Sequence, residues 1–138
     1  MSFIYHRTIH FPDTDAAGVV FFPNYLAICH EAYEEAVAAA GVPVRTFFSS
    51  SGVVVPVSKS SADYLRPLFC GDKVSVTVQP ELLTPETFSI TYEIIRLGRP
   101  DKIAGQVRTW HVCIDSQTRE RCALPEDLAS WIRNAKDE

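Results

Sequence analysis

Between Pro23 and Ala40 the sequence places apolar side chains at intervals of three and four residues, the spacing of one face of an α-helix. Proline is tolerated at the first helical position because its missing N–H would have had no partner inside the helix. Gly41 and Pro43 follow, and both residue types commonly end a helix. A helix this long with a wide apolar face has to be buried against another element. The predicted apolar face comprises Tyr25, Leu26, Cys29, Ala32, Tyr33, Ala36, Val37 and Ala40.

Most of the other regular patterns predict β-strands. Residues 74–79 and 88–94 alternate apolar and polar side chains, the period-two pattern of a strand with one buried face. Pro56 marks an edge strand or a bulge, because proline has no N–H to donate to a sheet. Three further extended segments are expected, at residues 3–11, 53–65 and 103–115.

The turns between these strands are short. Gly71-Asp72 and residues 98–101 have turn sequences, and strands joined by short turns run antiparallel. Pro125 opens a short C-terminal helix. The order is therefore one strand, one long helix, four strands and a small helix. The arrangement that buries the long helix is a curved antiparallel sheet of about five strands wrapped round it, which is the α+β hotdog fold. A single domain is expected over residues 1–138.

Composition narrows the classes of function. The formal net charge of -4 argues against nucleic acid as the main partner. The four cysteines form no CxxC pair and have no histidine at zinc-finger spacing, so no metal site is predicted. No apolar run reaches the roughly 20 residues that a bilayer-spanning helix needs, and no signal peptide opens the chain. A reducing cytoplasm is the expected location.

The junction between the first strand and the long helix, residues 13–25, is the part of the sequence best suited to chemistry. A helix N-terminus has unpaired N–H groups and a partial positive charge, which together can stabilise an oxyanion. Pro23 has no N–H, so the nearest useful donor is the amide of Phe22. Asp15 can come close to this helix start, and Gly18 lets the loop backbone approach a ligand.

Two chemical roles are open to the Asp15 carboxylate. It can attack a thioester carbonyl and form a mixed anhydride, or it can deprotonate a water molecule as a general base. A third interpretation is structural, since aspartate often closes a turn or caps a helix through its side chain. Asp13 is expected to be a loop or turn residue, with catalysis as the lesser alternative. Glu31 and Glu34 are expected on the solvated face of the helix, with a subunit contact as the alternative.

Residues 15–25, Asp-Ala-Ala-Gly-Val-Val-Phe-Phe-Pro-Asn-Tyr, resemble the signature of the 4-hydroxybenzoyl-CoA thioesterase family of hotdog proteins. The order of the predicted elements agrees with that family over nearly the whole chain. The resemblance is closer still to the cyanobacterial 1,4-dihydroxy-2-naphthoyl-CoA thioesterases of phylloquinone (vitamin K1) biosynthesis, through residues 29–34, 70–72 and 111–115. The bacterial 4-hydroxybenzoyl enzyme carries another carboxylate where this chain has His30, so the benzoyl specificity is not carried over.

The resemblance implies roles for single residues. The catalytic carboxylate of the family falls on Asp15, and its oxyanion-binding amide falls on Phe22. His30 lies at the border of the apolar face, and without the resemblance it would be expected only to pack against its neighbours. No cofactor and no metal are implied, and water is the second substrate. The substrate-binding residues that we expect are Gly18, His30, Ser58 and Ser60.

The function implied by the resemblance is hydrolysis of an aromatic acyl-CoA, with 1,4-dihydroxy-2-naphthoyl-CoA as the best single substrate. Two alternatives stay open. One is a thioesterase for short or medium aliphatic acyl-CoA, and the other is a non-catalytic module that binds acyl-CoA, since fold does not fix function.

Two further expectations concern partners. The phosphates of coenzyme A need local cations in an acidic chain, and Arg96, Arg99 and Lys102 cluster round one predicted turn. Exposed sheet edges invite pairing, and the resemblance implies a homotetramer built as a dimer of dimers, with sites at subunit contacts. Three other cations are scattered elsewhere, at Lys59, Arg66 and Arg108.

Overall fold

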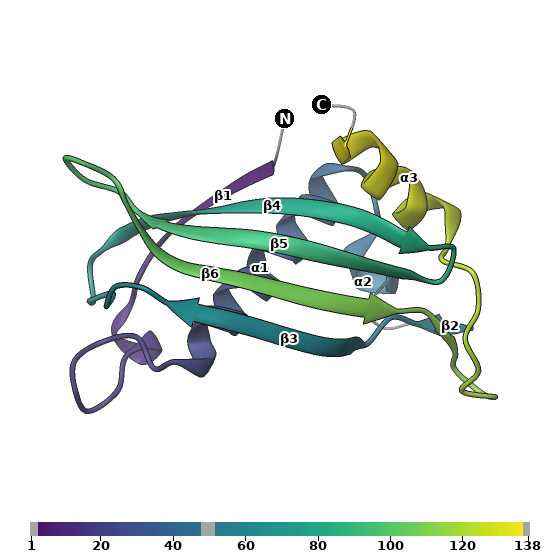
Figure 1. Cartoon of the computed structure of the whole chain (residues 1–138), viewed down its shortest axis with the longest axis horizontal. Coiled ribbons are helices and arrows are strands. Elements are labelled where there is room, and N and C mark those ends of the chain that lie inside the picture. The colour runs from purple at the N-terminus through teal and green to yellow at the C-terminus, as the bar shows by residue number, and fades with distance from the viewer. Residues whose placement is uncertain (1–2, 48–51, 137–138) are drawn as a thin grey trace.

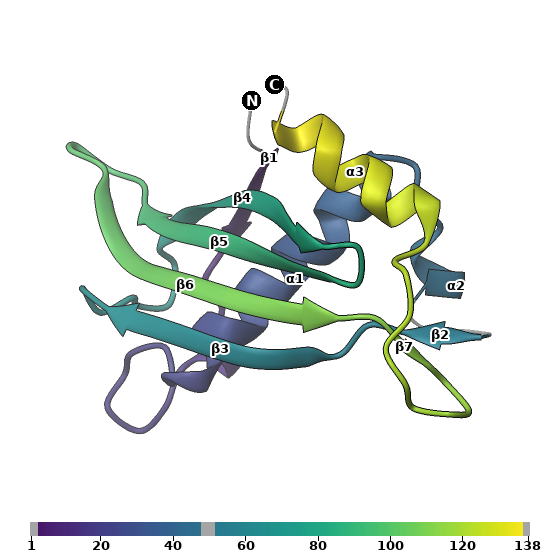
Figure 2. The same ribbon diagram turned by 45° about the vertical axis from the view of Figure 1, so that its right-hand side comes forward.

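The computed structural model describes residues 3–47 and 52–136. An antiparallel sheet of five strands, in the order β1-β4-β5-β6-β3, curves round the long helix α1 (Pro23–Ala39) (Figure 1). A second helix, α3 (Glu126–Lys136), lies beside α1 on the same side of the sheet (Figure 2). The predicted hotdog arrangement is confirmed. The strands are β1 Phe3–Thr8, β3 Val57–Tyr64, β4 Lys73–Thr84, β5 Thr87–Arg96 and β6 Lys102–Val112.

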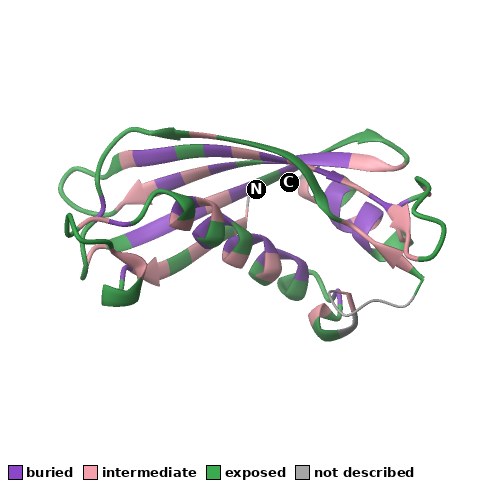
Figure 3. Ribbon diagram, turned by 90° about the horizontal axis from the view of Figure 1, so that it is seen from below, coloured by how far each residue is buried: buried purple, intermediate pink, exposed green. Residues whose placement is uncertain are grey.

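The core lies between α1 and the concave face of the sheet (Figure 3). The alternating residues of β4 and β5 bury their apolar side chains there, as their period-two patterns predict. On α1 the buried face is centred differently from the prediction, because Ile28 is fully buried while Leu26 is only half-buried. Ala40 is exposed because it caps the C-terminus of α1 and lies beyond its last turn.

Two predicted strands are each divided in two. Pro56 interrupts residues 53–65 and separates β2 (Val53–Val54) from β3, which forms one edge of the sheet. Residues 103–115 are divided at Cys113 into β6 and β7 (Ile114–Asp115). The short strands β2 and β7 pair with each other in a separate two-stranded sheet.

Other boundaries also differ from the expected ones. The first strand ends at Thr8 rather than at residue 11, because a 3-10 turn, η1 (Phe11–Asp13), begins there. The stretch after α1, expected to be irregular, contains a short helix, α2 (Val44–Phe47). Its continuation at residues 48–51 lies outside the described residues. In the described part of the chain, no helix is both long enough and apolar enough to cross a bilayer.

Close packing at Gly105 positions the start of α1. The Tyr25 ring lies so near this glycine of β6 that an added Cβ would be 3.0 Å from Tyr25 Cδ2. The Tyr25 hydroxyl donates to the Arg66 carbonyl at 2.9 Å, and its ring meets that of Tyr64 edge-on at 5.0 Å. The first turn of α1 is therefore held against β6 and the end of β3.

Candidate active site

Residues 13–21 form a small hairpin directly ahead of α1. The Asp15 N–H donates to the Val19 carbonyl at 2.9 Å, and the Gly18 N–H donates to the Asp15 carbonyl at 2.9 Å. Gly18 has φ +83°, in the left-handed region that glycine adopts without strain. One arm is anchored to the body of the protein, because the Val20 N–H donates to the Leu68 carbonyl at 2.8 Å.

Asp15 lies at the exposed tip of this hairpin. Its Oδ1 accepts the Ala17 N–H at 2.8 Å, so the side chain closes a turn, which is the structural role left open by the sequence. The other oxygen, Oδ2, has no donor among the described residues. One carboxylate oxygen therefore orients the side chain, and the other faces outward.

At the start of α1, one backbone amide is left over. The Phe21 N–H donates to the Asp13 carbonyl at 3.0 Å, and Pro23 has no N–H. The Phe22 N–H has no acceptor within the described residues, so it is the donor that the helix start offers to a ligand. The Asp13 carbonyl also accepts the Asn24 side-chain amide at 2.9 Å, which ties the base of the hairpin to the helix.

An ion-pair cluster that the sequence analysis missed supports the same junction. The Arg7 guanidinium contacts the Asp13 carboxylate and lies 3.0 and 3.1 Å from the two carboxylate oxygens of Glu31. The Tyr5 hydroxyl also donates to Glu31, at 3.0 Å. The Glu31 side chain remains 44% exposed, as expected for the solvated helix face, and it also binds Arg7 and Tyr5, which the sequence analysis did not predict. Arg7 falls on the same side of β1 as Phe3 and Tyr5, so the period-two pattern could have indicated that it points inward.

Two hollows lie between α1 and the edge strand β3. The first, of about 240 Å³, is beside the helix start and is lined by Phe22, Tyr25, Tyr64 and Arg66 among others. The second, of about 150 Å³, lies further along α1 and is lined in part by His30 and by Ser60 of β3. These two hollows are therefore the concave features that predicted site residues line, Phe22 in the first and His30 and Ser60 in the second.

The structure brings only some of the predicted site residues together. His30 and Ser60 share the second hollow, and Phe22 lines the first. Asp15 and Gly18 lie on the hairpin and line neither hollow. Ser58 lines neither as well, and its hydroxyl donates to the Trp110 carbonyl at 3.3 Å. His30 is exposed, and its Nδ1 pairs with Glu34 at 2.8 Å.

The floor of the second hollow contains polar side chains that the sequence analysis did not assign to a site. Thr109 Oγ1 lies 2.8 Å from His111 Nε2 and 3.4 Å from the Tyr92 hydroxyl. Burial, with a smaller contribution from the nearby His30, lowers the pKa of His111 to about 4, so His111 is neutral near pH 7. Burial also raises the pKa of Tyr92, which keeps its hydroxyl protonated.

The cations are distributed in two groups. Lys59 and Arg108 are not scattered, because both lie against the Trp110 ring, with Nζ 4.7 Å and Cζ 4.5 Å from its centroid. They are on the face of the sheet away from α1. The turn between β5 and β6, with Arg99, projects from the same end of the molecule as the 13–21 hairpin (Figures 1 and 2).

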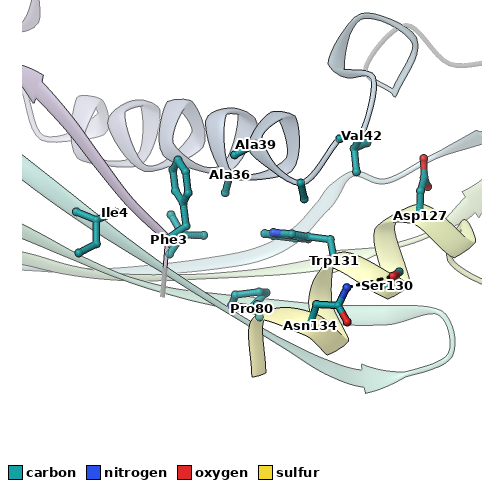
Figure 4. A pocket seen from close by; sticks show the side chains of 14 residues that line it. Phe3, Ile4, Ala36, Ala39, Val42, Pro80, Asp127, Ser130, Trp131 and Asn134 are labelled. Carbon is teal, nitrogen blue, oxygen red and sulfur yellow. Dashed lines mark hydrogen bonds between the residues drawn. The ribbon is translucent and has the colours of Figure 1, made fainter. Parts of the chain in front are cut away.

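A more voluminous cavity, of about 720 Å³, lies elsewhere. It lies between the C-terminal half of α1, β1 and α3, and Phe3 and Trp131 line it (Figure 4). The C-terminal end of a helix carries partial negative charge and disfavours an oxyanion or a phosphate. This cavity is therefore not the candidate site. Within residues 3–47 and 52–136, no three His, Cys, Asp or Glu side chains are grouped as metal ligands.

The fold defines a hotdog protein that has an acidic hairpin directly ahead of α1 and a free backbone amide at the helix start. The sequence matches the family described as the Thioesterase-like superfamily over residues 9–132, and the chain belongs to this family. It is 45% identical to the 1,4-dihydroxy-2-naphthoyl-CoA hydrolase of Thermosynechococcus vestitus, over 97% of this chain and 90% of that protein. It is 43% identical to the 1,4-dihydroxy-2-naphthoyl-CoA hydrolase of Nostoc punctiforme, over 99% of this chain and 91% of that protein.

A solved structure agrees with these relatives. The 1,4-dihydroxy-2-naphthoyl-CoA thioesterase of Synechocystis superposes on this chain with a TM-score of 0.91, at 30% sequence identity. The superposition covers 97% of each chain.

Proposed function

We propose that this chain hydrolyses 1,4-dihydroxy-2-naphthoyl-CoA to 1,4-dihydroxy-2-naphthoate and CoA, in phylloquinone biosynthesis. The observation that carries the proposal is the free Phe22 N–H at the start of α1, preceded by a hairpin that presents the outward oxygen of Asp15. Full-length identity of 43–45% to hydrolases of that substrate supports the choice of acyl group.

The chemistry follows from these two groups. The thioester carbonyl oxygen accepts the Phe22 N–H, and the partial positive charge of the helix start stabilises the negative charge that develops there. The Asp15 carboxylate either attacks the carbonyl carbon or removes a proton from the attacking water. The CoA thiolate then leaves and takes up a proton. In the first route, water afterwards hydrolyses the mixed anhydride and frees Asp15.

The acyl group is proposed to extend along α1 from the first hollow to the second. Eight residues separate Phe22 from His30, which corresponds to about 12 Å along the helix axis. This length accommodates a bicyclic acyl group that forms one hydrogen bond near Phe22 and another near His30. Gly18, His30 and Ser60 are proposed to contact the substrate, whereas Ser58 stays a prediction because its hydroxyl already bonds Trp110.

A panel of acyl-CoA thioesters tests the proposal through the release of free thiol. We expect kcat/KM to be at least about tenfold higher for hydroxynaphthoyl-CoA than for hexanoyl-CoA, since polar groups that lose their partner penalise the wrong substrate. A preference for hexanoyl-CoA would replace the aromatic substrate with an aliphatic one. Binding without any thiol release would instead favour a non-catalytic module.

We further propose that the working unit is a homotetramer, a dimer of dimers with sites at subunit contacts. Within the described residues, strand β3 pairs only with β6 and leaves its outer edge open, and the apolar side chains of Val57 and Tyr64 on this strand are exposed. Light scattering during gel filtration is expected to give four times the 15.4 kDa mass of the chain. A mass of 15.4 kDa at micromolar concentration would contradict this proposal.

The cytoplasm is the compartment that we propose. All four cysteines are free, including Cys113 and Cys122, whose sulfur atoms lie 3.6 Å apart without a bond. A reducing compartment keeps such a pair as thiols. Cell lysis directly into denaturant with an alkylating reagent, followed by mass spectrometry, is expected to show both residues labelled as thiols. A disulfide between them in freshly lysed cells would argue for an oxidising location.

A further inference from the structure

The hollow that contains His30 and Ser60 has a polar floor in an otherwise apolar core. Tyr92, Thr109 and His111 are 1%, 8% and 2% exposed, and Thr109 links the other two through its hydroxyl. Burying three polar side chains costs free energy unless each of them is fully hydrogen-bonded. Valine, phenylalanine and leucine would fill the same space without that cost, so packing alone does not account for these residues.

The hydrogen bonds within this chain of three residues leave both of its ends incomplete. If Thr109 donates to Tyr92, the threonine oxygen accepts from His111 Nε2–H, and the Tyr92 proton has no acceptor among the described residues. If instead Tyr92 donates to Thr109 and Thr109 donates to His111 Nε2, a lone pair of the Tyr92 oxygen has no donor among the described residues. In either case His111 Nδ1 is buried without a partner in the described part of the chain. Tyr92, Thr109 and His111 all line the hollow, so the incomplete Tyr92 end is within reach of a ligand there.

The size and rigidity of the hollow suit one aromatic ring. A cavity of roughly 150 Å³ accepts benzene in an engineered protein, and this hollow has about the same volume. The His111 ring stacks on Phe88 at 4.5 Å with an interplanar angle of 2°, which fixes its plane. Ser60 is the direct cross-strand partner of Thr109, so a second hydroxyl group is placed beside the floor.

We propose that the chain Tyr92–Thr109–His111 binds a ring hydroxyl of the acyl group and sets a preference for hydroxylated over unhydroxylated aromatic acyl groups. A hydroxyl both donates and accepts, so it completes the Tyr92 end whichever way the protons run. The inference rests on the proposed function, because it places the acyl ring of the substrate in this hollow. The preference is expected because a site built to bind a hydroxyl leaves buried polar groups unpaired with a substrate that lacks it.

The experiment compares kcat/KM for 1-hydroxy-2-naphthoyl-CoA and 2-naphthoyl-CoA in the wild type, Tyr92→Phe and Thr109→Val. The wild type is expected to prefer the hydroxylated substrate by at least about tenfold. In each variant most of this preference is expected to be lost, because kcat/KM falls for the hydroxylated substrate and stays the same for 2-naphthoyl-CoA. Thr77→Val is the matched control, because it removes a threonine hydroxyl from β4 that does not line the hollow, and it should keep the wild-type ratio.

The outcomes separate this inference from the function on which it rests. A wild type that cleaves both substrates with equal kcat/KM overturns the inference and leaves the thioesterase function standing. The same conclusion follows if both variants fold, as judged by their thermal melts, and keep the full wild-type preference. A wild type that cleaves neither naphthoyl thioester overturns the proposed function and this inference together.

Discussion

Asp15→Asn is expected to lower kcat by about a thousandfold or more while leaving the fold intact, because the reaction loses its nucleophile or base. The substitution is conservative for the structure. An asparagine Oδ1 can still accept the Ala17 N–H, the 2.8 Å contact that orients the side chain at the hairpin tip. Asp15 is exposed, so no buried charge is removed. Steady-state thiol release and circular dichroism, measured on the same preparations, check the two parts of the expectation.

The chain offers a matched control for this substitution. Asp101 Oδ1 accepts the Gly98 N–H at 2.8 Å and orders the turn between β5 and β6, as Asp15 orders its hairpin. Asp101→Asn is expected to keep near-normal turnover, because the change affects a turn without a free helix amide beside it. Asp15→Ala should be as inactive as Asp15→Asn and should also loosen the hairpin. Near-normal turnover in both Asp15 variants would remove the carboxylate from the mechanism.

Acidification from pH 7 to pH 5 is expected to reduce the free energy of unfolding by about 2 kcal/mol through His111 alone. Burial lowers the pKa of His111 from 6.5 to about 4 in the folded protein, with a smaller contribution from His30. The unfolded chain therefore takes up a proton as the pH falls through about 6.5, while folded His111 stays neutral. Stability is lost between about pH 6.5 and pH 4, and this contribution levels off below pH 4.

Urea unfolding of the wild type and of His111→Gln at pH 7, 6 and 5 measures this effect. The variant is expected to have a lower stability at pH 7 and a flatter dependence on pH, because glutamine does not titrate. The comparison uses the slope of the unfolding free energy with pH. A general loss of packing against Phe88 lowers the stability equally at each pH and does not change this slope. Equal slopes in the two proteins would show that folded His111 titrates normally. An NMR titration of the His111 ring, with a midpoint near 4, checks the cause directly.

Local patterns of the sequence predicted the parts of the site that are close together along the chain. The spacing from Pro23 to Ala40 predicted α1, and the loss of an N–H at Pro23 pointed to the Phe22 amide. The alternation in β4 and β5 predicted which side chains are buried. The family resemblance supplied the catalytic role that we expect for Asp15, which its geometry as a turn residue would not have suggested.

Contacts between distant segments could not be predicted in this way. Periodicity shows which face of an element is buried, but it does not show which element that face meets. Arg7 and Glu31 are joined only because β1 lies beside α1, and Lys59 meets Trp110 only because β3 pairs with β6.

The sequence by itself determined the helix, the alternating strands and the free amide ahead of the helix, because these depend on residues within a few turns or one strand of each other. Only the tertiary structure decided the hollow between α1 and β3 and its polar floor. His30, Ser60 and His111 come from three elements, and the strand order β5-β6-β3 together with the curvature of the sheet brings them to one place.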